Sequence, residues 1–116
     1  MKSKIYYQLI NVNDPKNIIN SILMMGSSYI KEYNPNIWFK LTNHQLDSTH
    51  KFLAVVDETN LENLFRHFQG DVWSPNGEAK ELIQSLGLRH TSMSVGDIVQ
   101  QDNKYYFCDN LGWIEI

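Results

Sequence analysis

The sequence predicts a single compact α+β domain spanning residues 1–116, in which an antiparallel sheet carries about three packed helices. Size is the first indication, because 116 residues with 42% hydrophobic side chains suit one domain around its own core. The second is that strand-like and helix-like segments do not alternate regularly, as they do in βαβ folds. The third is a C-terminal run of three strand-like segments, which predicts a three-stranded meander.

The first segments predict a strand followed by a helix. Lys4–Val12 is rich in isoleucine, tyrosine, leucine and valine, which favours a strand. A cap from Asn13 or Asp14, with a proline in the first turn, predicts a helix over residues 15–25. Apolar residues recur at helical spacing along it, and Gly26 is a suitable stop.

The next stretch predicts a loop and two strands. Residues 27–36 end in Asn-Pro-Asn, which indicates a loop. The segment Ile37–Leu41 predicts a short strand. The apolar run Phe52–Val56 has the length and character of a buried strand.

Two further helices are expected in the middle of the chain. Thr59 and Glu62 have the spacing of a capping box, which predicts the start of a helix over residues 61–69. The glycine that follows is expected to end this helix. Another helix is expected to open at the segment Ser74–Gly77 and to stop at Gly87.

The last third of the chain predicts the meander. Its turns are expected at Asp102-Asn103 and at Asn110-Leu111-Gly112. Its strands are expected at Met93–Val99, Tyr105–Cys108 and Trp113–Ile116. Short strands joined by short turns favour antiparallel neighbours.

Charge and cysteine content exclude several classes of protein. A net charge of −3 excludes a basic nucleic-acid wrapper and is too weak for an acidic DNA mimic. One cysteine, Cys108, excludes an internal disulfide and the usual zinc patterns, so a reducing cytoplasm is the expected location. No apolar stretch approaches the ~20 residues of a membrane span, and the first residues predict no signal peptide.

Three segments near the C-terminus carry a family resemblance. They are His90–Val99 (HTSMSVGDIV), Tyr105–Phe107 and Leu111–Ile116. Together they resemble the YodL-like domain family, over about residues 88–116. Two further pieces, Phe39–His44 and Trp73–Ala79, are similar to segments of small phage and plasmid proteins. The resemblance implies a phage or mobile-element accessory protein and brings no catalytic residue with it.

The residues of this tail pattern also have a structural interpretation. Gly96-Asp97 is typical of a bulge or tight turn, where glycine adopts backbone angles that other residues avoid. Ser92 and Ser94 are expected to bond to nearby backbone, and Asp97 to accept amides in the same turn. The alternative is that these side chains form a surface recognised by a ligand or partner.

The same residues also raise the question of catalysis. Ser92, Ser94, His90 and Asp97 lie within eight residues, and with His44 as a further candidate they suggest a small hydrolase or nuclease-like enzyme. No Gly-x-Ser-x-Gly elbow accompanies them, and alternate strand residues face opposite sides. We therefore assign no catalytic residue.

Neither a metal nor a cofactor is expected. None of the four histidines has the spacing of a metal-binding pair, so no metal ligand is assigned. The six glycines stand singly, so no phosphate-binding loop and no cofactor site is predicted.

The aromatic residues favour a protein partner. Lysines and arginines are spread along the chain, so nucleic acid is not the expected partner, and a regulatory nucleic-acid binder remains only a third hypothesis. Tyr29 and Tyr33, together with Trp73, are the chosen anchors because exposed aromatics concentrate binding energy. The leading hypothesis is a non-enzymatic phage or mobile-element protein that docks on a host protein, such as a CRISPR or restriction complex.

Overall fold

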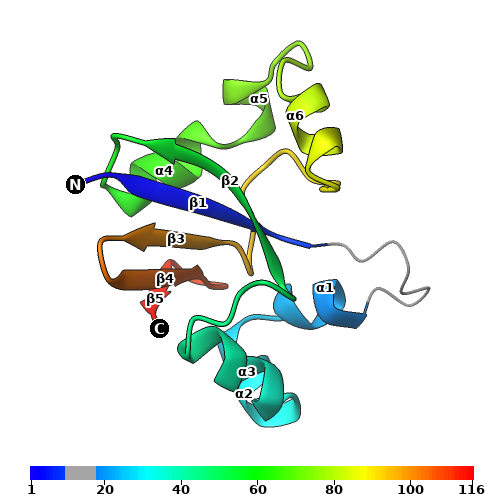
Figure 1. The fold of residues 1–116 in the computed structure, drawn as a ribbon, viewed down its shortest axis with the longest axis vertical. Helices are drawn as coiled ribbons and strands as arrows, with labels where there is room; N and C mark the ends of the chain where they lie inside the picture. Colours follow the sequence, from blue (N-terminus) through cyan, green and yellow to red (C-terminus); the bar gives the residue numbers. More distant parts are fainter. Residues whose placement is uncertain (10–17) are drawn as a thin grey trace.

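A five-stranded antiparallel sheet forms the centre of the protein (Figure 1). The computed structural model describes residues 1–9 and 18–116. The strands are β1 (Ser3–Gln8), β2 (His50–Val56), β3 (Ile98–Gln101), β4 (Lys104–Cys108) and β5 (Trp113–Glu115). They lie side by side in the order β2-β1-β3-β4-β5, and each neighbouring pair is antiparallel. The α+β class and the C-terminal meander β3-β4-β5 are confirmed.

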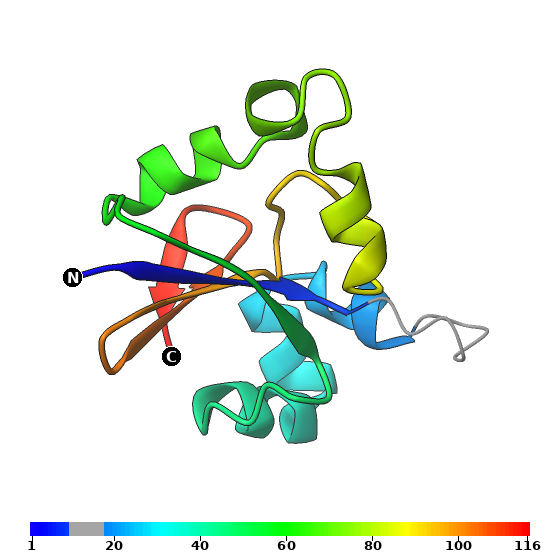
Figure 2. The same cartoon turned by 45° about the horizontal axis from the view of Figure 1, so that its top comes forward.

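Short helices cover both faces of this sheet (Figures 1 and 2). The described residues form α1 (Ile18–Leu23), α2 (Ser27–Tyr33), α3 (Pro35–Thr42), α4 (Leu61–His67), α5 (Gly70–Trp73) and α6 (Lys80–Ser85). The first three lie on one face and the last three on the other, so two helical layers enclose the sheet. None of these helices is long and apolar enough to cross a lipid bilayer.

Two apolar cores follow from the alternation of side chains along each strand. Ile5 and Tyr7 point to one face, where they join a first core completed by α4 to α6. Tyr6 lies between them in the chain and packs against a second core beneath α1 to α3. Val99 and Ile98 divide in the same way between the two cores. The central strands therefore supply both layers.

The prediction for residues 27–41 is wrong. The expected loop at 27–36 contains α2, and the expected strand Ile37–Leu41 lies inside α3. Asn34-Pro35, which indicates a turn, is instead the junction of the two helices, with the proline at the start of α3 where its missing N–H costs nothing. Four-residue spacing places Ile37 and Leu41 against the second core.

The prediction for the N-terminal elements is only partly testable. The strand expected at Lys4–Val12 ends at Gln8, and residues 10–12 lie outside the described residues. The helix expected over 15–25 spans Ile18–Leu23, and its predicted cap and proline also lie outside the described residues.

The helix expected over 61–69 begins at Leu61 as predicted, but its cap and its end differ, and so does the start of the next helix. Asn60, not Thr59, caps α4, because its side chain accepts the Asn63 amide at 3.0 Å. Gly70 begins the four-residue helix α5 instead of ending a helix. The helix expected to open at Ser74 begins at Lys80, since the Ser74 hydroxyl accepts the Ala79 amide at 2.9 Å and closes a loop before it.

The strand expected at Met93–Val99 is also shorter than predicted. It begins at Ile98, because Val95 and Gly96 form a turn that interrupts the extended chain. The turn at Asp102-Asn103 is confirmed, with Asp102 at a φ of 54°. The turn before β5 is confirmed as well, and the Asp109 amide donates to the Gly112 carbonyl across it.

Candidate functional site

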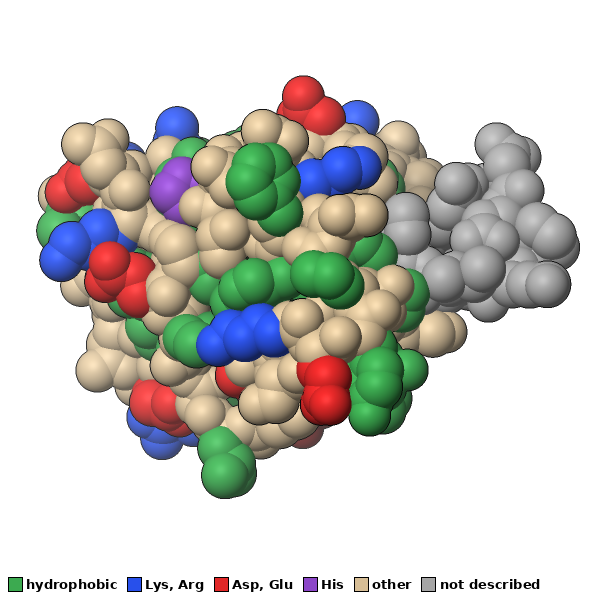
Figure 3. Space-filling view, turned by 90° about the horizontal axis from the view of Figure 1, so that it is seen from below, with side chains coloured by type: hydrophobic (Ala, Val, Ile, Leu, Met, Phe, Trp, Pro, Cys, Tyr) green, Lys and Arg blue, Asp and Glu red, His purple; other side chains and the backbone are tan. Residues whose placement is uncertain are grey.

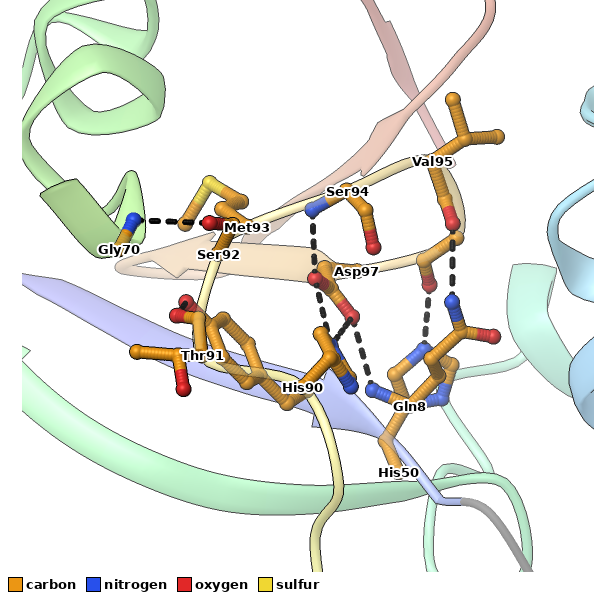
Figure 4. Close-up of polar contacts among 12 residues, drawn as sticks. Gln8, His50, Gly70, His90, Thr91, Ser92, Met93, Ser94, Val95 and Asp97 are labelled. Atoms are coloured by element: carbon orange, nitrogen blue, oxygen red, sulfur yellow. Dashed lines mark hydrogen bonds and ion pairs between the residues drawn. The ribbon is translucent and has the colours of Figure 1, made fainter. Parts of the chain in front are cut away.

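The tail pattern lies in the connector between α6 and β3, here called the 88–97 connector (Figure 4). Its centre is the carboxylate of Asp97, which is fully buried. The backbone amides of Gln8 and Ser94 donate to it at 2.9 and 2.8 Å. His90 Nε2 lies 3.2 and 3.1 Å from its two oxygens. Three donors therefore satisfy a charge that would be costly to bury alone.

The ring of His90 is held by a second contact. It stacks on the ring of Tyr7 with centroids 4.5 Å apart and planes 18° from parallel. About a fifth of the His90 side chain remains exposed. Burial, and the nearby charge of Asp97, raise the pKa of Tyr7, so its hydroxyl stays protonated and donates to the Thr91 carbonyl at 2.8 Å.

A tight turn brings Asp97 into place. The Asp97 amide donates to the Ser94 carbonyl at 3.0 Å, and Gly96 has a φ of 100°. A β-turn with positive φ at its third residue is typical of type II and favours glycine there. The predicted turn at Gly96-Asp97 is confirmed, and so is the expectation that Asp97 accepts an amide within it.

Ser92 bonds to more distant backbone. Its hydroxyl accepts the Gly70 amide at 2.7 Å, which joins the connector to the start of α5. Ser94 makes two contacts with Asp97 through its own backbone: its amide donates to the Asp97 carboxylate, and its carbonyl accepts the Asp97 amide. The turn therefore uses the main chain of one serine, and α5 is attached through the side chain of the other.

Two buried polar residues near Asp97 escape sequence analysis. His50 Nε2 lies 2.6 Å from the Gly96 carbonyl, and its Nδ1 lies 2.8 Å from the Thr49 hydroxyl. Because a carbonyl only accepts, Nε2 carries the proton and Nδ1 accepts from the threonine. Burial lowers the pKa of His50, so the neutral ring is favoured.

Gln8 is the second of these residues. Its Nε2 donates to the Val95 carbonyl at 3.0 Å, while its Oε1 is buried with no hydrogen-bond partner among residues 1–9 and 18–116. It is directly opposite His50 in the β1–β2 register. The local signal that could have indicated Gln8 is a polar residue at the end of a largely apolar strand. The residues that Gln8 contacts are distant in the chain, so the sequence does not reveal them.

The structure separates His44 from His90. His44 follows α3, where its Nε2 lies 3.0 Å from the Ile116 carbonyl and its ring stacks on Tyr105 at 3.8 Å. Tyr105 packs against the second core, whereas Tyr7, under His90, belongs to the first. The two histidines therefore lie on opposite faces of the sheet, and of the suggested catalytic groups the structure pairs only His90 with Asp97.

Trp73 is partly buried. Its Nε1 donates to the Thr91 carbonyl at 3.0 Å, the same oxygen that accepts from Tyr7. Its ring meets Phe68 edge-on at 5.2 Å. Trp73 therefore fastens α5 to the connector while part of its surface remains accessible.

The other two predicted anchors lie on α2. Tyr29 and Tyr33 occupy one side of this helix with ring centroids 4.8 Å apart, and Tyr33 is 62% exposed. On the adjoining α3, Phe39 is 61% exposed, and Lys31 Nζ lies 5.0 Å from the Trp38 ring. We call Tyr29, Tyr33, Trp38 and Phe39 the α2–α3 aromatic surface. Figure 3 views the molecule from this end and shows several separate groups of hydrophobic side chains, with polar and charged side chains between them.

The described part of the chain offers no cluster of three or more histidine, cysteine, aspartate or glutamate side chains that could hold a metal ion. Comparisons with protein-family models, with curated proteins and with solved structures find no match.

Proposed function

We propose that the protein is a non-enzymatic binding module that docks on a host protein through the α2–α3 aromatic surface. The observation that carries this proposal is the exposure of Tyr33 and Phe39, at 62% and 61%, on two adjoining helices. Large aromatic side chains bury much area at low entropic cost, and they are enriched among the residues that dominate binding energy. The partner is expected to offer apolar pockets that take these two rings.

The hydrogen bonds around Asp97 support the absence of catalysis. Its carboxylate is fully buried and already accepts from three donors, so it offers a substrate no free oxygen at the surface. A general base must come within hydrogen-bond reach of the proton it removes. We therefore assign His90 and Asp97 a structural role, which is to hold the 88–97 connector against the sheet.

The finer features of the proposal rest on the resemblance of the tail. These features are that the protein comes from a phage or mobile element, that it acts in the host cytoplasm, and that its target is a host defence complex. The net charge of −3 is too small for imitation of DNA, which supports contact through shape and apolar surface.

The test is to capture a partner from host lysate with this protein and then to measure how tightly the purified partner binds. We expect the double variant Tyr33→Ser/Phe39→Ser to lose at least about tenfold in affinity by calorimetry, as losing two aromatic anchors should cause. Leu111→Ser is the matched control, because Leu111 is 96% exposed in the turn before β5. Equal binding by wild type and double variant, or equal loss in the control, contradicts the proposal.

A further inference from the structure

We propose that a hollow between α5, α6 and the 88–97 connector is a second binding site, and that it takes an acidic peptide segment of a protein partner. The hollow has a volume of about 740 Å³. That is within the range of roughly 300–1,000 Å³ for ligand sites. The helices α5 and α6 belong to the layer of the first core, across the sheet from α2 and α3 (Figure 2).

One face of α6 forms a wall of this hollow. Lys80, Ile83 and Gln84 line it, and their spacing of three and four residues places them on a single side of the helix. Gly87, just beyond the end of α6, lines the hollow as well. Ile83 is only 5% exposed, so it supplies an apolar floor, while Lys80 and Gln84 are exposed at the rim.

The connector contributes a second cation. Leu88, Arg89 and Thr91 of the connector line the hollow, and Leu88 extends the apolar floor at 4% exposure. Arg89 is exposed, and neither it nor Lys80 forms an ion pair with any residue that the structure describes. The hollow therefore combines an aliphatic floor with two positive charges that form no ion pair with the residues that the structure describes.

Among the residues that the structure describes, no acidic one lines the hollow, although the protein as a whole carries a net charge of −3. Two nearby glutamates are placed elsewhere. The Glu78 carboxylate accepts the Asn76 amide at 2.9 Å, and Glu81 follows Lys80 on α6 and is turned away by about 100°. The charge of the lining is thus complementary to an anionic group.

Peptide carboxylate fits this lining better than phosphate does. Phosphate sites usually rely on backbone amides of glycine-rich turns. All three glycines that line the hollow have amides already in use: Gly70 donates to Ser92, Gly77 to Ser74 and Gly87 to Gln84. The positive charge that binds the ligand must then come from side chains. The apolar floor also favours a ligand that has an aliphatic group next to its negative charge. An extended segment with leucine between two glutamates offers both.

The test is a titration of the whole chain, observed by ¹H–¹⁵N correlation spectra. The probe is acetyl-Gly-Glu-Leu-Glu-Gly-amide, compared with the neutral acetyl-Gly-Gln-Leu-Gln-Gly-amide and with inorganic phosphate. We expect the acidic peptide to shift the amide signals of Gly77, Lys80, Gly87 and Arg89, and the neutral peptide to leave them in place. No shift with the acidic peptide, equal shifts with both peptides, or the same shifts with phosphate alone overturns the proposal.

A pair of variants makes the charge requirement specific. Lys80→Gln/Arg89→Gln should weaken binding of the acidic peptide by at least about tenfold, since both cations are lost. Lys4→Gln/Lys104→Gln removes the same total charge from exposed strand positions and should bind as wild type does. Equal weakening in both pairs would show attraction by net charge and would overturn the site. Both pairs leave the α2–α3 aromatic surface intact, so the two proposals fail independently.

Discussion

His90 Nε2 lies 3.1 Å from Oδ2 of Asp97, and that carboxylate also receives the backbone amide of Gln8 at 2.9 Å. One buried side chain thus ties the connector before β3 to the end of β1. Gln8 and Asp97 are 89 residues apart in the chain, so this hydrogen bond is a long-range tertiary contact and not only part of a local turn.

Removal of the Asp97 side chain should destabilise the fold strongly. Asp97→Ala leaves two backbone amides and His90 without their acceptor, and we expect a loss of about 3 kcal/mol in the free energy of unfolding. Asp97→Asn retains one acceptor oxygen and should lose less. Urea denaturation measures both. Asp47→Ala, at an exposed position, is the control and should change stability by less than about 0.5 kcal/mol.

The turn glycine offers a separate test of the connector. Gly96 has a φ of 100°, and a Cβ there would lie 3.1 Å from Leu23 Cβ and 3.2 Å from the Leu23 carbonyl oxygen. Gly96→Ala should therefore cost about 2 kcal/mol, from backbone strain and from crowding against α1. Gly77→Ala separates the two causes, because its φ of 82° is also positive but nothing lies within 4 Å of the added carbon. If both variants lose the same stability, crowding at Leu23 plays no part.

Local signals account for the parts of the fold that sequence predicts correctly. The meander follows from short strands and turn residues such as Asp102-Asn103, and the turn at Gly96 follows from the demand for positive φ. Asn34-Pro35 misleads because the same pair suits a turn and a helix start. Gln8 and His50 lie opposite each other because of the register of β1 against β2, and no local sequence pattern specifies that register. The sequence therefore marks His90 and Asp97 as neighbouring candidates, but it indicates neither their pairing nor the buried groups around them.

Stability should fall when the pH decreases below about 6.5, in part because of His50. Burial lowers the pKa of His50 from 6.5 in the folded protein. The unfolded chain therefore binds a proton near pH 6.5, whereas the folded chain does so only at lower pH, and within this window acid favours unfolding. Asp97 and His90 are the charged or titratable groups that act on this ring.

The contribution of His50 can be isolated with one variant. His50→Gln retains a donor for the Gly96 carbonyl but cannot titrate. Urea unfolding between about pH 8 and about pH 5 should show a steeper loss of stability in the wild type than in the variant. Parallel curves for the two proteins would show that the pH dependence arises from other groups.

Cys108 should not react with thiol reagents in the folded protein. Burial, with smaller contributions from the charges of Asp97 and Asp109, raises the pKa of Cys108 to about 12. At about pH 8 the thiolate would be roughly one part in 10⁴, and the side chain is only 3% exposed. Labelling by a chromogenic disulfide should proceed at the rate set by unfolding and become fast in concentrated urea. The destabilised Asp97→Ala variant should label faster than wild type, because it unfolds more readily and the thiol reacts from the unfolded state. Rapid labelling of the native wild type would contradict the burial of Cys108.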